Sequence, residues 1–118
     1  MKIILILKIY SIKMNHQDIN TSSFRQMIQE DSFVLIDVRT HEEFCEGHIR
    51  GAVNIDIYKT TFEEDIDEYD KRKRYLIYCR SGNRSRQAMY LMRDLGFEEV
   101  YNLEHGIISW NEHKFPVE

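Results

Sequence analysis

Residues 75–95, YLIYCRSGNRSRQAMYLMRDL, predict a strand, a tight polar loop and a helix. The apolar run YLIYC ends at Cys79, and the residues RSGNR lead from there to a helix that is expected to begin at Ser85. Apolar residues recur in that helix at spacings of three and four, a pattern typical of one buried face, at Ala88, Leu91, Met92 and Leu95.

Cys79 stands where a strand of an α/β sheet would end, and ligands bind at that end of such strands. The following helix directs its free backbone N–H groups and the positive end of its dipole to the same place. A helix N-terminus and neighbouring arginines both lower the pKa of a cysteine. We therefore predict that Cys79 is a nucleophile in an anion cradle, rather than a buried structural cysteine, with the cradle formed by Arg80, Ser81, Gly82, Asn83, Arg84 and Ser85.

The rest of the chain alternates strands with helices. This order predicts an α/β fold with a mostly parallel sheet of about five strands and helices on both faces. Apolar, β-favouring runs predict further strands over 33–36, 52–55 and 100–103. Capping residues and apolar spacing predict helices over 21–30, 41–45, 59–70 and 106–113.

Length and composition favour one domain, which is expected over residues 15–118 of a 118-residue chain. The net charge of −4 gives no sign of nucleic-acid binding. Two isolated cysteines, Cys45 and Cys79, form no disulfide framework, which favours a reducing, cytoplasmic location. The five histidines show no metal-ligand spacing, so neither a metal nor a cofactor is expected.

Residues 1–14, MKIILILKIYSIKM, form an apolar extension outside the expected domain. A signal peptide is disfavoured because Lys8 interrupts the apolar run and no small-residue cleavage site follows. The segment is also too short and too charged to span a bilayer, for which about 20 apolar residues are needed. We interpret it as an extra strand, a helix or a frayed tail, and Met14 is a candidate natural start.

The motifs, taken in order over residues 19–117, resemble the rhodanese family of single-domain sulfurtransferases. The motifs are LIDVRTHEEFCEGHIRGAVNI (35–55), YCRSGNRS (78–85), LGFEEVYNLEHG (95–106) and Trp110. The resemblance implies the rhodanese-like fold and the ping-pong reaction of a thiosulfate sulfurtransferase. Cys79 would take a sulfane sulfur from a donor such as thiosulfate and pass it, as a persulfide, to a thiophilic acceptor such as cyanide or a thiol.

The expected partners are therefore a small sulfur donor and a small acceptor, with a protein thiol as an alternative acceptor. No membrane or nucleic-acid partner is expected, and the chain is expected to be a monomer or a weak dimer. In the implied reaction, backbone N–H groups would hold the persulfide and Gly82 would allow close approach or positive φ. Arg80 and Arg84 would bind the donor oxyanion. Ser81 and Ser85 would donate to sulfur or cap the helix, and for Ser85 the cap is favoured.

Other residues receive roles by the same resemblance. Arg50 occupies a position of the GHIRGA motif at which some sulfurtransferases place a substrate-facing arginine, so it is a third substrate-binding candidate. Asp37 and Arg39 are expected to form a structural pair near the site. His48 is expected to hydrogen-bond a turn and Glu43 to be architectural, because a cradled thiolate needs no general base.

The sequence departs from the family pattern at two places. His105 precedes Gly106 where relatives often have paired glycines, which changes the backbone freedom of the turn. Cys45 replaces a commonly polar residue, and a role in resolving the persulfide is disfavoured.

Two other interpretations stay open. Phosphatases and arsenate reductases of the related cysteine-loop type have the pattern C-x5-R, whereas the loop from Cys79 to Arg84 reads C-x4-R. The shorter loop predicts a smaller cradle that suits one sulfur atom better than a tetrahedral oxyanion. The second alternative is non-enzymatic: a persulfide carrier or a partner-binding module on the same scaffold.

Overall fold

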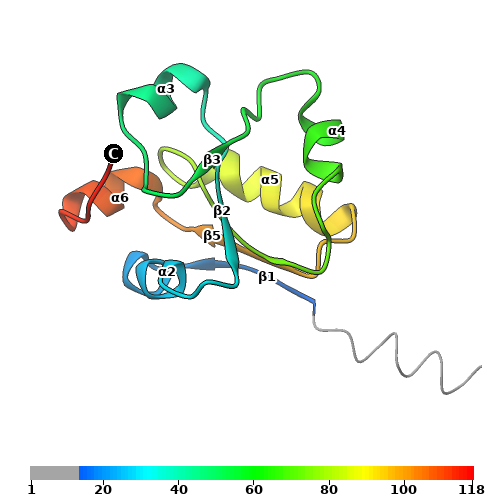
Figure 1. The fold of residues 1–118 in the computed structure, drawn as a ribbon, viewed down its shortest axis with the longest axis horizontal. Coiled ribbons are helices and arrows are strands. Elements are labelled where there is room, and N and C mark those ends of the chain that lie inside the picture. The colour runs from blue at the N-terminus through cyan, green and yellow to red at the C-terminus, as the bar shows by residue number, and fades with distance from the viewer. Residues whose placement is uncertain (1–13) are drawn as a thin grey trace, which may run out of the picture.

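A five-stranded parallel sheet with the strand order β1-β5-β4-β2-β3 forms the centre of the computed structural model, which describes residues 14–118 (Figure 1). The strands are β1 (Asn15–Ile19), β2 (Phe33–Asp37), β3 (Val53–Asn54), β4 (Arg74–Tyr78) and β5 (Glu99–Leu103). The helices are α2 (Thr21–Ile28), α3 (His41–Glu46), α4 (Phe62–Asp67), α5 (Asn83–Asp94) and α6 (Gly106–Glu112). The predicted α/β architecture is thus confirmed.

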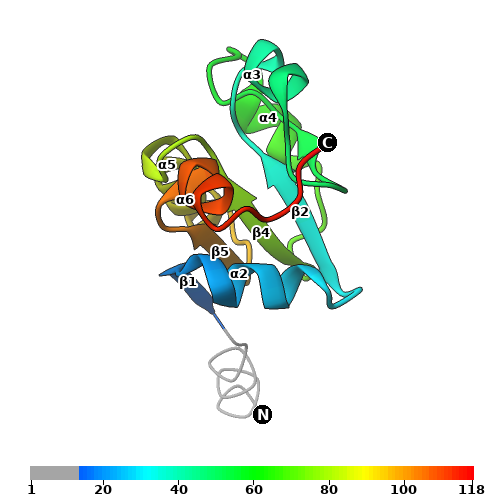
Figure 2. The ribbon, with the colours of Figure 1, turned by 90° about the vertical axis from the view of Figure 1, so that its left-hand side faces the viewer.

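Helices cover both faces of the sheet (Figure 2). Two hydrophobic cores result, because alternate residues of a strand point to opposite faces. On one face, α4 and α5 pack on β4 through residues that include Ile66, Met89 and Ile77. On the other face, α2 and α6 pack through Phe24 and Trp110, whose rings meet edge-to-face at 6.5 Å.

The strand β1 was not predicted. Its sequence NHQDI has no apolar alternation, and Ile19 is its one β-branched residue, so the pattern that indicates a strand is missing. It pairs with β5 over its whole length, from Asn15 opposite Glu99 to Ile19 opposite Leu103. The interpretation of the N-terminal extension as an extra strand, a helix or a frayed tail concerns residues 1–13, which lie outside the described part of the chain.

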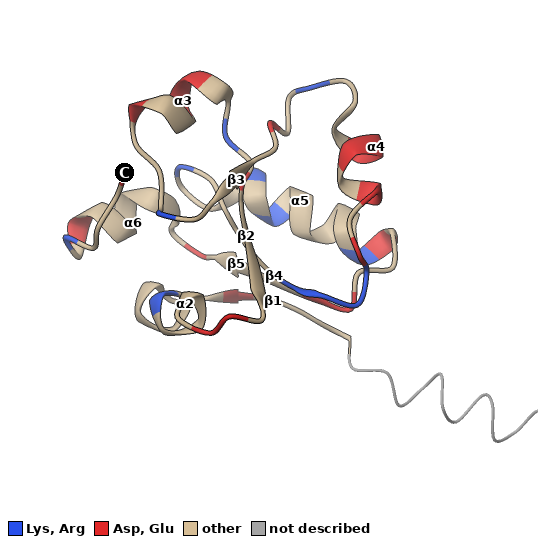
Figure 3. Cartoon of the chain, viewed as in Figure 1, with Lys and Arg blue, Asp and Glu red and all other residues tan. Residues whose placement is uncertain are grey.

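Several helix boundaries also differ from the prediction by one residue or more, and α2 ends at Ile28 instead of residue 30. The helix expected over 59–70 is shorter in the structure. Residues 59–61 form a bend and turns, and α4 begins at Phe62 and ends at Asp67. Acidic residues fill this segment, and negative charge is unfavourable at a helix C-terminus (Figure 3). The helix expected to begin at Ser85 begins two residues earlier, at Asn83.

The carboxyl ends of β2, β4 and β5 meet at one edge of the sheet. The chain continues from these ends into α3, α5 and α6, respectively. Cys79 directly follows β4, the middle strand of the three. The topology therefore places the predicted nucleophile at the end of the sheet from which the chain enters α3, α5 and α6.

Candidate active site

Hydrogen-bond donors surround the sulfur of Cys79. The backbone N–H of Gly82 donates to Sγ at 3.1 Å, and the hydroxyl of Ser85 donates to it at 3.3 Å. Cys79 is only 1% exposed and belongs to the hydrophobic core on the α5 side of the sheet. Residues 79–85 thus place donors from Gly82 and Ser85 against one buried sulfur atom, and we call this loop the sulfur cradle.

The cradle favours the thiolate form of Cys79. Burial raises the pKa of the thiol, but hydrogen bonds from the Ser85 hydroxyl and from the N–H groups of Ser85, Gly82 and Ser81 lower it. The hydrogen bonds outweigh burial, so the pKa lies below its ordinary value. Cys79 therefore carries more thiolate near neutral pH than an ordinary cysteine, and the thiolate is the nucleophilic form.

The role of Ser85 differs from the one that was favoured on sequence. Ser85 is the third residue of α5, not its cap, and the N-cap position belongs to Gly82. Its side chain is fully buried and points at Cys79. The reason is the earlier start of α5, which turns Ser85 inward.

Two glycines let the cradle fold tightly against the end of β5. Gly82 has φ +99°, and a Cβ atom there would lie 2.0 Å from the carbonyl oxygen of Glu104. Gly106 has φ +66°, and a Cβ atom there would lie 2.1 Å from the carbonyl oxygen of Arg80. His105 has φ −112°, so the first glycine of the paired-glycine pattern is not needed for this turn.

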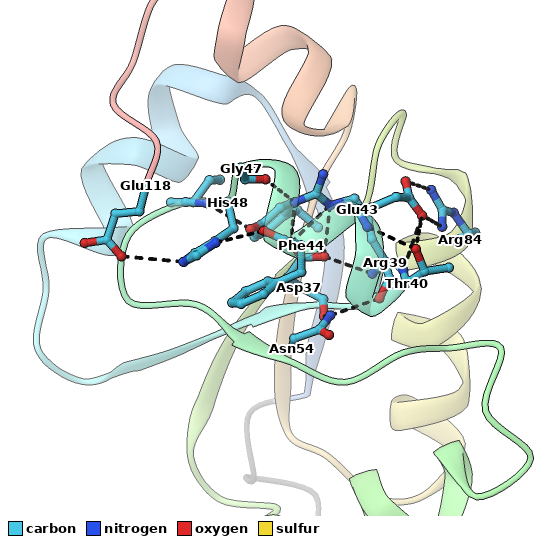
Figure 4. Close-up of polar contacts among 12 residues, drawn as sticks. Asp37, Arg39, Thr40, Glu43, Phe44, Gly47, His48, Asn54, Arg84 and Glu118 are labelled. Atoms are coloured by element: carbon cyan, nitrogen blue, oxygen red, sulfur yellow. Dashed lines mark hydrogen bonds and ion pairs between the residues drawn. The ribbon is translucent and has the colours of Figure 1, made fainter.

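Arg84 does not stand free as an anion-binding group. Its guanidinium forms two parallel hydrogen bonds with the carboxylate of Glu43, at 2.7 and 2.9 Å (Figure 4). Glu43 also closes a capping box with Thr40 at the start of α3. The pair joins α3 to α5 across the sulfur cradle, and it neutralises one of the two cradle arginines.

We expect the Glu43→Gln variant to lose a pH-dependent part of the stability. The hydrogen bond from Arg84 lowers the pKa of Glu43 from 4.5 to about 2. A carboxylate with a lowered pKa stabilises the fold above its unfolded pKa, and that contribution is lost as pH falls toward the folded value. The difference in free energy of unfolding between parent and variant should therefore shrink between about pH 5 and about pH 3 in urea titrations.

Glutamine retains an oxygen acceptor for the capping box, so this substitution keeps the cap and removes the charge together with one of the two hydrogen bonds from Arg84. Glu42→Gln, on the exposed side of the same helical turn, is the matched control and should show no such pH dependence. A parent–Glu43→Gln difference that stays constant over this pH range would contradict the assignment.

Arg80 is the cradle arginine that forms no ion pair among the described residues. It is exposed and lines a hollow of about 390 Å³ beside the cradle, between α3 and α6. The other residues of this hollow are Arg39, Glu43, Glu46, Gly47, Ile107, Ile108, Asn111 and Val117. The hollow thus combines Arg80, a cation without an ion pair among the described residues, with the carboxylates of Glu43 and Glu46 and with apolar side chains of α6.

Asp37 and Arg39 form a buried ion pair at the end of β2. The shortest of their contacts joins Arg39 Nη2 to Asp37 Oδ2 at 2.7 Å. The same nitrogen donates to the carbonyl of Gly47 at 2.7 Å, which ties the strand to the end of α3 (Figure 4). The amide of Asn54 bridges the backbone carbonyls of Asp37 and Arg39. These contacts hold the end of α3 against the end of β2.

His48 and Arg50 lie away from the cradle. His48 stacks on Phe44 and contacts its carbonyl through Nδ1 at 3.0 Å, while Nε2 lies 3.5 Å from the carboxylate of Glu118. The side chain of Arg50 is 84% exposed, also pairs with Glu118, and is absent from the hollow lined by Arg80. The structure therefore brings neither side chain to Cys79.

Cys45 is exposed on α3, with its sulfur 3.4 Å from Nε2 of His41. No contact between Cys45 and the cradle is present among the described residues. Within residues 14–118, no group of three or more candidate side chains could hold a metal ion. In the same range, no helix has the length and hydropathy needed to cross a bilayer.

The structure adds two residues that the sequence did not indicate. Asn102 on β5 donates to the carbonyl of Gly82 at 3.1 Å, and Asp18 on β1 accepts from Asn102 at 2.8 Å. Asn102 lies within a quoted motif, but nothing in its spacing distinguished it. Asp18 lies on the strand that was missed.

Comparisons with known proteins identify the family of the chain. The family model described as rhodanese-like domain matches residues 20–113. A protein from Allochromatium vinosum named sulfurtransferase is 33% identical over 101 residues, which cover 85% of this chain and 92% of that protein. A tRNA uridine(34) hydroxylase from Bartonella bacilliformis is 36% identical over 93 residues, which cover 73% of this chain but 30% of that protein.

The fold has solved counterparts as well. The crystal structure of a rhodanese-related protein from Thermoplasma volcanium superposes with a TM-score of 0.76 at 31% identity, covering 86% of this chain and 97% of the other. Family match, full-length relative and fold agree, and the chain therefore belongs to the rhodanese-like family of sulfurtransferases.

Proposed function

We propose that this chain transfers a sulfane sulfur by way of a persulfide on Cys79, with thiosulfate as a donor and cyanide or a thiol as acceptor. The observation that carries the proposal is the sulfur cradle: two donors within 3.3 Å of Sγ at the start of a helix. Such donors stabilise an anionic sulfur whether it belongs to a thiolate or to a persulfide.

The reaction balances without an external oxidant or reductant. The Cys79 thiolate attacks the outer sulfur of thiosulfate, the sulfur–sulfur bond of the donor breaks, and sulfite leaves with the bonding pair. The acceptor then attacks the outer sulfur of the persulfide, and the Cys79 thiolate is released with its electron pair. Cyanide becomes thiocyanate, and a thiolate becomes a persulfide. Each half-reaction begins and ends with an anion on sulfur.

The two arginines of the cradle, Arg80 and Arg84, have different roles under this proposal. Arg80 is exposed and unpaired among the described residues, so it is the group that attracts the sulfonate end of the donor. Arg84 is held by Glu43 and fixes the start of α5 instead. Arg50, which lies outside the hollow, has no part in donor binding under this proposal.

The decisive test is the intact mass of the protein after incubation with thiosulfate. We expect the parent to gain the mass of one sulfur atom and to lose it again when cyanide is added. Cys79→Ser should gain nothing, and Cys45→Ser, which removes the exposed cysteine, should behave as the parent does. Turnover of an aryl phosphate without any sulfur adduct would overturn the proposal in favour of a phosphatase.

A further inference from the structure

Asn102 has an environment that simple packing does not explain. It is fully buried on the face of β5 that packs against α5, at a position where an apolar residue would be expected. Its Nδ2 donates to two acceptors, Asp18 Oδ1 at 2.8 Å and the carbonyl of Gly82 at 3.1 Å. Its Oδ1 is buried without a hydrogen-bond partner among the described residues.

The orientation of this amide is set by its neighbours. Asp18 and Gly82 both present acceptor oxygens, so only the nitrogen end of the amide can face them. Asp18 lies directly opposite Asn102 in the paired strands and is itself held by Arg86 of α5, whose Nε lies 3.1 Å from Oδ2. Leaving Oδ1 unpaired costs free energy, and what the arrangement gains is a hydrogen bond to the cradle.

Gly82 is the cradle residue that Asn102 reaches. The Gly82 carbonyl accepts two hydrogen bonds, one from Asn102 of β5 and one, at 3.1 Å, from the backbone N–H of Arg86 in α5. The Cα of Gly82 lies close to the carbonyl of Glu104, which follows β5. The N–H of the same residue points at Cys79 Sγ. Contacts from the end of β5 and from the first turn of α5 therefore hold Gly82 in the orientation in which its N–H meets the sulfur.

We propose that Asn102, oriented by Asp18, is a positioning residue that aims the Gly82 N–H at the sulfur of Cys79. This inference deepens the proposed function and rests on the anionic sulfur that it requires. The role needs no contact with substrate. Loss of the Asn102 amide should leave the Gly82 carbonyl held by the Arg86 N–H alone and loosen the orientation of Gly82, so that the donor to the thiolate and to the persulfide is weakened.

The test is a titration of the Cys79 thiolate by its ultraviolet absorbance, which reads the sulfur directly and does not require transfer activity. All variants carry Cys45→Ser, and the spectrum of the Cys45→Ser/Cys79→Ser protein is subtracted. We expect Asn102→Leu to raise the midpoint by about one pH unit, the loss expected for one hydrogen bond to a charged group.

Variants of Asp18 distinguish a positioning role of Asn102 from a merely structural role. Removal of a negative charge by itself lowers the pKa of a nearby thiol. Asp18→Ala, which frees the Asn102 amide, should nevertheless raise the midpoint. Asp18→Asn keeps an oxygen acceptor for Asn102, so its midpoint should stay at or below that of the parent. Glu30→Ala, which breaks an exposed ion pair with Arg74 elsewhere, should leave the midpoint unchanged.

The possible outcomes distinguish failure of the positioning role from failure of the proposed function. The Asp18 variants decide the question even if Asn102→Leu does not fold, because the Asp18 side chain is partly exposed and its loss leaves no cavity in the core. A midpoint in Asp18→Ala that is equal to or below that of the parent would overturn the proposal. A parent that forms no persulfide, but whose thiolate midpoint still responds as described, would sink the proposed function and leave the positioning role standing.

Discussion

Gly82→Ala is expected to lose about a hundredfold or more of the sulfur-transfer rate constant kcat/KM, the effect of removing one donor from an anion-stabilising site. The added Cβ would lie 2.0 Å from the carbonyl oxygen and 2.7 Å from the carbonyl carbon of Glu104. These are backbone atoms at the end of β5, so the loop has to move instead. When it moves, the Gly82 N–H no longer points at Cys79.

The same variant should lose about 2–5 kcal/mol of unfolding free energy, which combines the left-handed backbone conformation with overpacking. Gly96→Ala separates the two contributions. Gly96 has φ +96°, close to the +99° of Gly82, but a Cβ atom there would meet nothing within 4 Å. Gly96→Ala should cost about 1–2 kcal/mol and keep full activity. Equal activity of the two variants would contradict the close-approach argument.

The fold could be predicted from sequence wherever a pattern is local. The central strand, the long helix α5 and the turn at Gly96 each follow from apolar spacing and capping within a few residues. The nucleophile could be predicted for the same reason, because Cys79 and its loop are contiguous. Local signals thus gave the alternation of strands and helices and the position of the cysteine.

The contacts that tune the site join residues far apart in sequence and could not be predicted. Arg84 meets Glu43 across 41 positions, and Asn102 meets Asp18 across 84. Both pairs depend on the order in which strands and helices lie side by side, and one of them requires a strand that has no apolar pattern. Sequence reasoning therefore left Arg84 as a free anion-binding group.

Asp37→Ala is expected to be the most destabilising substitution of a charged residue near the site. It would leave the guanidinium of Arg39, which is 6% exposed, without its buried carboxylate. Breaking a buried pair by removing one partner costs about 3–5 kcal/mol, out of the 5–15 kcal/mol typical of a whole domain. Urea unfolding followed by the fluorescence of Trp110 measures this loss. Asp94→Ala, which breaks an exposed pair with Arg93, should change stability by less than about 0.5 kcal/mol.

The double variant Asp37→Leu/Arg39→Met separates the contribution of this ion pair to stability from its contribution to sulfur transfer. Replacing both members of a buried ion pair by apolar side chains is often close to neutral, so this protein should recover most of the lost stability. It lacks the hydrogen bond from Arg39 to Gly47 that anchors the end of α3, and α3 carries Glu43, the partner of Arg84. Sulfur transfer should therefore remain below that of the parent although the fold is restored. If activity and stability recover together, the pair serves the fold alone, and the tie from β2 through α3 to the cradle has no effect on the chemistry.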